Sequence, residues 1–153
     1  MSTTLTCNKN LLSPVGFRLK VANYPNLEYF ANAVTLPSLS LSEAASSYKS
    51  VNYAEPGDRI NFDTLSIRFS VTEDMDNYLE VFNWMHSLAQ SDDDLRSDAT
   101  LHILTSHNNS SKTVRFTGLF PTNLDALEFD AGTSDVEYLQ ATATFKFTYF
   151  EVI

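Results

Sequence analysis

The sequence predicts one mainly β domain, with antiparallel strands, one flanking α-helix that covers the sheet and a long projecting hairpin. Three observations predict this fold class. Five segments alternate apolar and polar residues with period two, one segment has helical periodicity, and 43% of the 153 residues are hydrophobic. Because this length fits one domain, we expect a single folded unit over residues 1–153, with residues 1–12 as an N-terminal arm.

The first two predicted strands lie close together in the chain. In residues 15–21 every second side chain is apolar, which is typical of a strand with one buried face. The second strand, Leu27 to Leu36, is less regular and ends at Pro37, which cannot donate a ladder hydrogen bond. Residues 23–26 predict the turn between the two strands.

Three later strands alternate more regularly, at residues 64–71, 112–117 and 139–149. The last of these is the longest, with Thr, Gln and Lys opposite a face of Leu, Ala, Phe and Tyr. Residues 101–104 predict a short sixth strand. All of these segments therefore fit a half-buried antiparallel sheet.

Residues 74–89 break this period and predict one amphipathic helix that covers the sheet. Asp74 is the expected N-cap, and Trp84 falls near the edge of the apolar face, where it anchors either the core or a subunit contact. The expected inward side chains are Tyr78, Val81, Phe82, Met85 and Ala89. The expected outward side chains are Asp76, Asn77, Glu80 and Asn83.

Residues 38–58 form a long segment, rich in Ser and Ala, between the second strand and the strand at Leu65. Segments of this length without a regular period are usually functional or disordered. Weak alternation through Leu39, Leu41, Tyr48 and Val51 predicts a projecting hairpin that a neighbour must cover. A turn is expected at Pro56-Gly57-Asp58.

No motif points to catalysis, nucleotide binding or metal binding. The four glycines form no phosphate-binding loop, and Asp92-Asp93-Asp94 with Asp98 lack the glycine and glutamate of a calcium loop. The histidines have no metal-ligand spacing: His86, His102 and His107. One further acidic group is expected to mark a loop after Pro121: Asp125, Glu128 and Asp130. We therefore expect no enzyme, no cofactor and no metal.

The single cysteine, Cys7, allows no intrachain disulfide. No apolar stretch reaches the roughly 20 residues of a membrane span, and no signal peptide is evident, so we expect a protein kept in a cytosol. The formal charge of −9 argues against tight binding to nucleic-acid phosphates, but not against contact with passing DNA.

The basic residues project from the polar faces of the predicted strands: Arg18, Lys20, Arg68, Arg115 and Lys146. This polar face is either a lumenal or assembly surface or an ordinary solvated sheet face, and both interpretations stay open.

Four segments, in order, carry a family resemblance: Ala31 to Pro37; Pro56 to Arg59 with Phe62-Asp63; the Glu73 to Trp84 helix; and Phe116 to Asn123. Together they resemble the tail tube proteins of T-even-type contractile phages, from about Ser13 to Ile153. The resemblance implies an antiparallel β-sandwich or barrel with one flanking helix, a structural subunit that closes six at a time into a ring. Stacked rings would then form a tube whose lumen conducts the viral genome during ejection.

The resemblance also implies partners and contacts. The partners would be further copies of the chain, sheath, baseplate and tape-measure proteins, and DNA passing without sequence recognition, with no membrane. The location would be the virion tail, assembled in the host cytoplasm. The hairpin would reach a neighbouring subunit or the next ring, and the expected contact residues are Ser46, Tyr48, Lys49, Val51, Tyr53, Arg59 and Trp84.

Two alternatives remain open. The same fold serves tube initiators, tail completion proteins, terminators and secretion-system tubes, so this chain could instead cap one end of a tube. The other alternative is a small β-sandwich enzyme or carbohydrate-binding module, with Trp84 and tyrosines as its binding platform. Which strand face lines the lumen is also open.

Overall fold

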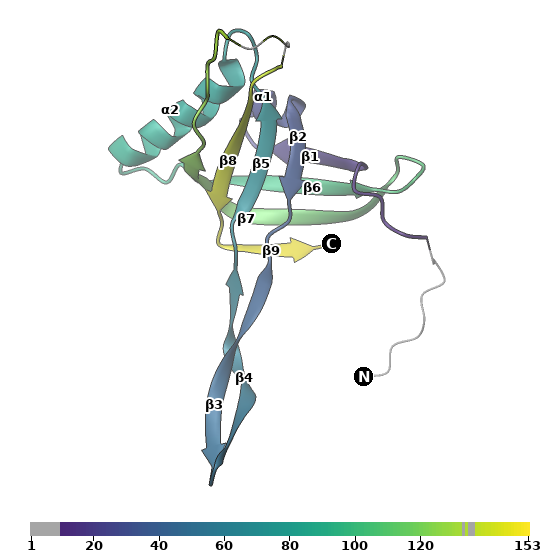
Figure 1. Cartoon of the computed structure of the whole chain (residues 1–153), viewed down its shortest axis with the longest axis vertical. Helices are drawn as coiled ribbons and strands as arrows, with labels where there is room; N and C mark the ends of the chain where they lie inside the picture. The colour runs from purple at the N-terminus through teal and green to yellow at the C-terminus, as the bar shows by residue number, and fades with distance from the viewer. Residues whose placement is uncertain (1–9, 133, 135–136) are drawn as a thin grey trace.

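The computed structural model describes residues 10–132, 134 and 137–153, and these form nine strands and two helices (Figure 1). In chain order the elements are β1 (Phe17–Val21), α1 (Pro25–Tyr29), β2 (Ala31–Thr35), β3 (Leu39–Tyr48), β4 (Val51–Phe62), β5 (Leu65–Ser70), α2 (Asp76–Gln90), β6 (Ser97–Leu104), β7 (Ser110–Leu124), β8 (Gln140–Lys146) and β9 (Tyr149–Val152). Cys7 and most of the expected N-terminal arm lie outside the described residues. Neither helix is both long and apolar enough to span a membrane, within the part of the chain that is described.

Two antiparallel layers make the body of the protein, and β7 belongs to both. The back layer contains β1, β6, the first half of β7 and β9. The front layer contains the second half of β7, β8, β5 and β2, in that order. Figure 1 shows the front strands crossing the back strands steeply. The expected antiparallel sandwich is therefore confirmed, and the strands do not close into a barrel.

Gly118 lets β7 turn from the back layer to the front layer. Its φ of +70° is a left-handed backbone conformation that residues with a Cβ rarely adopt. A Cβ at this position would also lie 2.6 Å from Thr148 Oγ1. The Thr148 N–H donates to the carbonyl oxygen of Thr117 over 2.8 Å, so the β8–β9 connection crosses at this bend. The predicted single strand 139–149 is therefore wrong: β8 pairs in the front layer and β9 in the back layer.

The core lies between the layers and is made by alternating inward side chains, as period two predicts. Its fully buried members include side chains of β5, β7 and β8: Leu65, Ile67, Phe69, Phe116, Ala143 and Phe145. Val15, expected on the inward face, is 85% exposed because it precedes the first residue of β1, Phe17. Strands β6 and β7 confirm the predictions at 101–104 and 112–117 and extend beyond them.

Helix α2 confirms the predicted helix, but its buried face is rotated from the expected one. Asn77, Val81 and Trp84 are buried. Phe82, expected to point inward, is 48% exposed. Figure 1 shows the helix lying against one end of the two layers, so only a narrow stripe of its surface meets the core.

The start of α2 explains why a polar residue is buried there. The side chain of Asn77 donates to the carbonyl oxygen of Ser70 and accepts from the backbone N–H of Thr72. A buried amide with these partners is satisfied and ties the helix to the end of β5. The predicted N-cap, Asp74, is wrong, because Met75 occupies that position with a φ of 58° and no side-chain capping bond.

The short helix α1 replaces the first part of the predicted second strand. Pro25 occupies its first turn, where a fixed φ and a missing N–H are tolerated. Glu80 on α2 accepts hydrogen bonds from Asn26 Nδ2 at 2.8 Å and from the backbone N–H of Leu27 at 3.3 Å. Leu27 is fully buried. Of the predicted second strand, Leu27 to Leu36, only β2 is therefore a strand.

Strands β3 and β4 form the predicted hairpin, which projects from the body along the longest axis of the molecule (Figure 1). They pair from Leu39 and Phe62 at the root to Tyr48 and Val51 at the tip. Phe62 anchors the root, with its ring centroid 5.1 Å from that of Phe150. The rest of the arm adds no side chain to the buried core.

The expected turn at Pro56-Gly57-Asp58 is wrong, because these residues lie within β4. The tip turn is at Lys49, with a φ of 54°. The register shifts between Leu41 and Glu43, and a Cβ on Gly57 would collide with the Ser42 side chain and backbone. The Pro-Gly pair therefore marks a bulge where the two strands approach closely.

Candidate assembly surfaces

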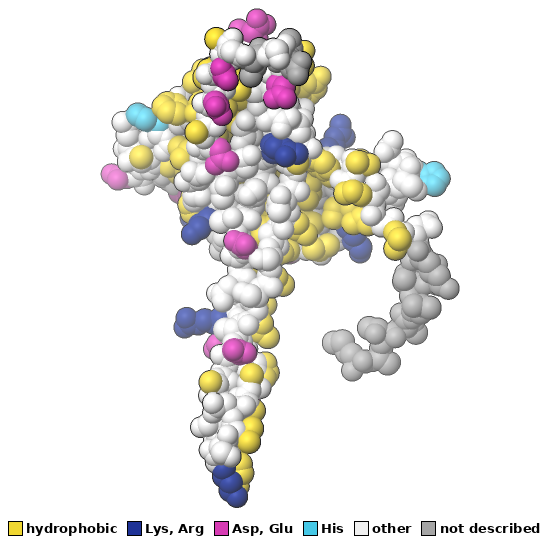
Figure 2. All heavy atoms as spheres, viewed as in Figure 1, with side chains coloured by type: hydrophobic (Ala, Val, Ile, Leu, Met, Phe, Trp, Pro, Cys, Tyr) yellow, Lys and Arg dark blue, Asp and Glu magenta, His cyan; other side chains and the backbone are white. Residues whose placement is uncertain are grey.

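The hairpin presents apolar side chains to solvent at both of its ends. At the root Leu39, Leu41 and Ile60 are 55–57% exposed, and Leu41 pairs with Ile60 across the strands. At the tip the exposed side chains are Tyr48, Val51 and Tyr53. Figure 2 shows hydrophobic side chains along one edge of the arm. Such exposure on a narrow two-stranded arm makes it a candidate contact surface.

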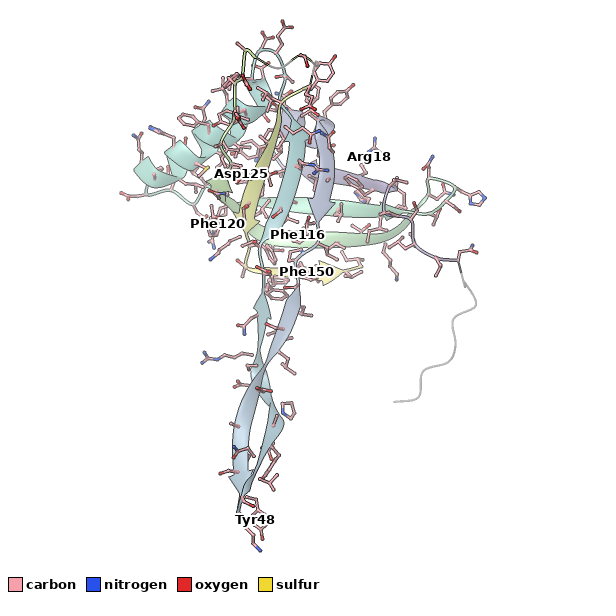
Figure 3. The ribbon with its side chains drawn as sticks, viewed as in Figure 1. Arg18, Tyr48, Phe116, Phe120, Asp125 and Phe150 are labelled. Atoms are coloured by element: carbon pink, nitrogen blue, oxygen red, sulfur yellow. The ribbon has the colours of Figure 1, made fainter. Side chains whose placement is uncertain are left out.

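The tip side chains share one face of the hairpin. Tyr48 pairs with Val51, and Ser46 pairs with Tyr53 and donates to its hydroxyl oxygen over 3.1 Å. Lys49 Nζ lies 5.5 Å from the centroid of the Tyr48 ring. Figure 3 labels Tyr48 at the far end of the arm. The structure thus brings together five of the residues expected at a subunit contact.

Arg59, also expected there, lies on β4 beside the bulge, where its backbone N–H donates to Ser42 Oγ over 3.2 Å. Its side chain is exposed, closer to the root than to the tip. The root residues Leu41 and Ile60 were not in the predicted contact set. Their alternation with Ser40 and Asn61 is the sequence signal that marks them.

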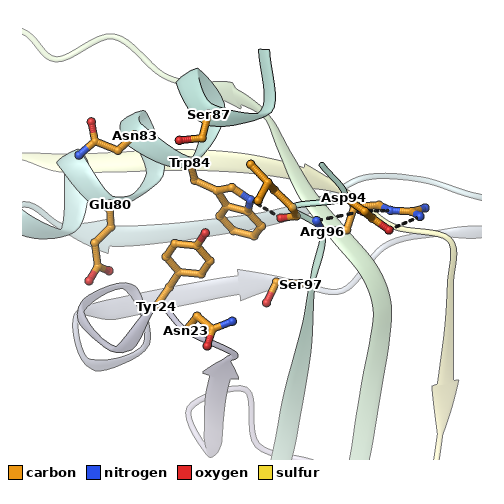
Figure 4. A pocket seen from close by; sticks show the side chains of 10 residues that line it. Asn23, Tyr24, Glu80, Asn83, Trp84, Ser87, Asp94, Arg96 and Ser97 are labelled. Atoms are coloured by element: carbon orange, nitrogen blue, oxygen red, sulfur yellow. Dashed lines mark hydrogen bonds and ion pairs between the residues drawn. The ribbon is translucent and has the colours of Figure 1, made fainter. Parts of the chain in front are cut away.

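Trp84, also expected at a subunit contact, lies in the core and apart from the exposed residues of the hairpin. It is 3% exposed, and its ring stacks on Tyr24 with centroids 4.2 Å apart. Trp84 Nε1 donates to the carbonyl oxygen of Leu95 over 2.9 Å, which fixes the loop after α2 (Figure 4). Its indole therefore anchors the core, which was the other predicted role.

The pocket beside Trp84 contains acids that already have structural partners (Figure 4). Glu80 holds α1, as described above, and desolvation by burial, then the charge of Glu80, raises the pKa of Tyr24. Arg96 donates to both carboxylate oxygens of Asp94 over 2.7 Å, and this hydrogen bonding lowers the pKa of Asp94 to about 2. The contacts of Glu80 and Asp94 therefore stabilise the surrounding structure.

The histidines lie on three different segments of the fold. His86 is on the exposed side of α2, His102 Nδ1 lies 3.2 Å from Thr113 Oγ1 on the back layer, and His107 lies in the β6–β7 turn. Among the described residues no three His, Cys, Asp or Glu side chains come together as a metal site would need. Of the other predicted acids, Asp98 accepts from the N–H of Gly118 and Asp125 from Asn123.

The predicted basic face is divided between the two layers. Arg18 and Lys20 on β1 lie with Arg115 on the outward face of the back layer, where Arg115 pairs with Glu151 at 3.6 Å. Arg68 on β5 and Lys146 on β8 lie on the outward face of the front layer. The five residues therefore do not form one surface.

The outward face of the front layer is almost uncharged, as its pale surface in Figure 2 shows. Its side chains on β2, β5 and β8 are Asn32, Ala33, Thr35, Ser66, Arg68, Ser70, Gln140, Thr142, Thr144 and Lys146. None of them is acidic, although the chain has nineteen Asp and Glu residues. Sequence alternation placed these residues on the polar side, but their lack of acids becomes visible only when the strands are paired.

Known proteins were compared with this chain by sequence and by structure. No protein-family model and no curated protein matches it. The cryo-EM structure of the tube-terminating cap of the anti-feeding prophage has a TM-score of 0.76 at 10% identity and covers 98% of this chain and 95% of its own.

Two further cryo-EM structures come from the PVC extracellular contractile injection system, both at 18% identity. Its sheath/tube terminator has a TM-score of 0.75 and covers 95% of this chain and 98% of that one. Its sheath-tube complex has a TM-score of 0.69 and covers 95% of this chain and 94% of that one. The fold that the resemblance implied is therefore confirmed: this chain has the fold of the tube and tube-terminating proteins of contractile tails and injection systems.

Proposed function

We propose that this protein is a structural subunit of a contractile tail or injection tube and works by assembling with copies of itself. The exposed hairpin carries this proposal. Six large apolar side chains on it are 46–67% exposed. A two-stranded hairpin is marginally stable by itself in water, so an arm of this kind needs a neighbour. The proposed contact residues are those of the hairpin: Leu39, Leu41, Ser46, Tyr48, Lys49, Val51, Tyr53, Arg59 and Ile60.

The open front layer supports closure between copies. Strand β2 is the last strand of that layer, and among the described strands only β5 pairs with it. An unpaired sheet edge is a template for pairing with another chain. A closed ring removes such edges, and we propose a ring of six, the number that the phage resemblance implies.

We assign the outward face of the front layer to the wall of the bore. Its two cations, Arg68 and Lys146, stand among small hydroxyl and amide side chains and form no ion pair with a described residue. Tight binding of nucleic acid needs many phosphate contacts, which two separated cations per copy do not supply. This wall therefore suits DNA that passes without being held or read. In this arrangement sheath, baseplate and tape-measure proteins are the other partners.

A tube terminator is the second candidate function. It is favoured by the two terminating proteins, whose TM-scores of 0.76 and 0.75 exceed the 0.69 of the sheath-tube complex. A terminator uses the same fold in a single ring and meets a different protein on one side. The two candidates therefore differ in whether the chain stacks on itself.

Sedimentation velocity of the purified chain over a wide concentration range separates these candidates. A tube subunit forms rings at low concentration and larger particles whose mass rises with concentration. A terminator stops at the mass of one ring. A chain that sediments as a monomer at every concentration contradicts both.

A further inference from the structure

The hairpin tip has a distinct chemical character within an acidic protein. From Ala44 to Ala54 the only charged residue is Lys49. Around it Tyr48 is 67% exposed and Val51 is 63% exposed. The tip is therefore a small aromatic and apolar surface with one positive charge, at one end of the longest axis of the molecule (Figure 1).

The opposite end of that axis carries acidic and aromatic side chains. We call it the crown and define it as Tyr29, residues 72–75, residues 128–132 and residues 137–139. A hydrogen bond of 2.9 Å from the N–H of Val71, which directly precedes residues 72–75, to the Leu139 carbonyl oxygen holds two of these segments together. The Ser70 N–H, beside it, donates to the carbonyl oxygen of Phe30 over 3.1 Å and so places Tyr29 at the same end.

The crown exposes three aromatic rings that have no role in the core. Tyr29 is 81% exposed, Phe129 is 75% exposed and Tyr138 is 85% exposed. The last two lie along a surface hollow of about 440 Å³ that Glu128 and Glu137 also line. Such strong exposure of three large rings at one end of a chain is typical of an interaction surface.

The charge of the crown is opposite to that of the tip. Its acids are Glu73, Asp74, Glu128, Asp130 and Glu137, and no Lys or Arg lies among its described residues. Figure 2 shows acidic side chains gathered at this end and a basic side chain at the far end of the arm. Complementary charges of this kind orient two surfaces as they meet.

We propose that the hairpin tip of one copy docks on the crown of the next copy along the long axis. Lys49 then meets the carboxylates, while Tyr48, Val51 and Tyr53 cover the exposed rings. Both surfaces belong to the same chain, so the partner that fits the crown is a second copy. The contact joins two different patches, head to tail, and such contacts build rings or open-ended stacks. This inference rests on the proposed structural function and names the contact that joins its copies.

A charge-swap experiment on the full chain tests this contact. Lys49→Glu, and separately Glu128→Lys with Glu137→Lys, each place like charges opposite one another. We expect each to raise the concentration needed for stacking about tenfold at low salt, and the combined variant to return it close to the wild-type value. The measurements are sedimentation velocity and particle length in negative-stain images, at low and high salt, because salt weakens such pairs.

Two charge-matched controls accompany these variants. Lys112→Glu, on the back layer, makes the same change of charge as Lys49→Glu. Asp92→Lys with Asp93→Lys, in the loop after α2, makes the same change of charge as the double variant of the crown. We expect both to stack like the wild type, and circular dichroism to show every variant folded.

The outcomes distinguish failure of the proposed structural function from failure of the contact between the tip and the crown. A wild-type chain that stays monomeric contradicts the structural function as well as the contact, whereas a wild-type chain that stops at one ring overturns the contact alone. Stacks that form equally well with Lys49→Glu overturn the contact alone, as does a combined variant that fails to regain stacking. In those cases the tip meets another surface of the neighbour, such as the apolar root of its hairpin.

Discussion

Replacing Phe116 with Asp is expected to leave the chain unfolded at room temperature. Phe116 is fully buried, and its ring centroid lies 5.2 Å from that of Phe147 and 5.6 Å from that of Phe150 (Figure 3). Loss of a core Phe costs about 3–5 kcal/mol, and an unpaired buried carboxylate adds several more. The sum is comparable to the whole stability of a domain, about 5–15 kcal/mol. Far-UV circular dichroism and urea unfolding measure the loss.

Phe82→Asp is the matched control, since Phe82 is the α2 residue that the sequence places inward and the structure leaves 48% exposed. We expect its free energy of unfolding to change by no more than about 1 kcal/mol. If Phe82→Asp unfolds the chain while Phe116→Asp does not, the assignment of the core is wrong.

Deleting residues 45–51 is expected to leave a folded chain that no longer stacks. None of these residues is buried, so the free energy of unfolding should fall by no more than about 1 kcal/mol. The deletion removes Lys49 and two of the three tip apolar side chains, Tyr48 and Val51, and with them the contact to a neighbour. Urea unfolding reports the fold, and sedimentation velocity reports the assembly.

The control for the deletion keeps the arm at full length. Ser47 and Asn52 pair with each other on the face of the hairpin opposite the tyrosines. Ser47→Ala with Asn52→Ala should therefore stack like the wild type. Stacks of wild-type length from the deletion variant would show that the tip has no part in assembly, and an unfolded deletion variant would show that the arm supports the body.

Most of the fold could be predicted because strands with one buried face repeat every second residue. The β5 segment and the inward residues of β8 follow this rule without exception. Helix α1 could not be predicted, because five residues are too few to show a helical period and Pro25 also suits a turn. The break between β8 and β9 depends on Thr148 crossing Gly118, a contact between distant residues that no local pattern contains.

The candidate surfaces were predicted in part. The hairpin was found because residues 38–58 are too long for an ordinary loop and still alternate weakly. Its turn was misplaced, since Pro56-Gly57 suits a bulge as well as a turn, whereas the Lys49 turn has no Gly or Pro to mark it. Trp84 was ambiguous because a residue at the edge of a helical face becomes buried or exposed according to the neighbouring elements, here α1 and the loop at Leu95.

The distribution of charge over the surface is the property that could least be predicted from the sequence. A net charge of −9 says nothing of where the acids lie. Alternation places Arg18 and Arg68 on polar faces but cannot tell that these faces belong to different layers. Only the pairing of β2, β5 and β8 shows a face without acids, and only the folding of the loops around the Leu139 hydrogen bond gathers acids into the crown.

Electron microscopy of the purified wild-type chain tests the central claim, that this protein assembles into a hollow particle, most directly. Our account predicts rings with an open centre, alone or stacked into tubes, in negative-stain images. At higher resolution the front layer, with Arg68 and Lys146, should face the bore. Images that contain only separate particles of the size of one 153-residue chain would contradict it.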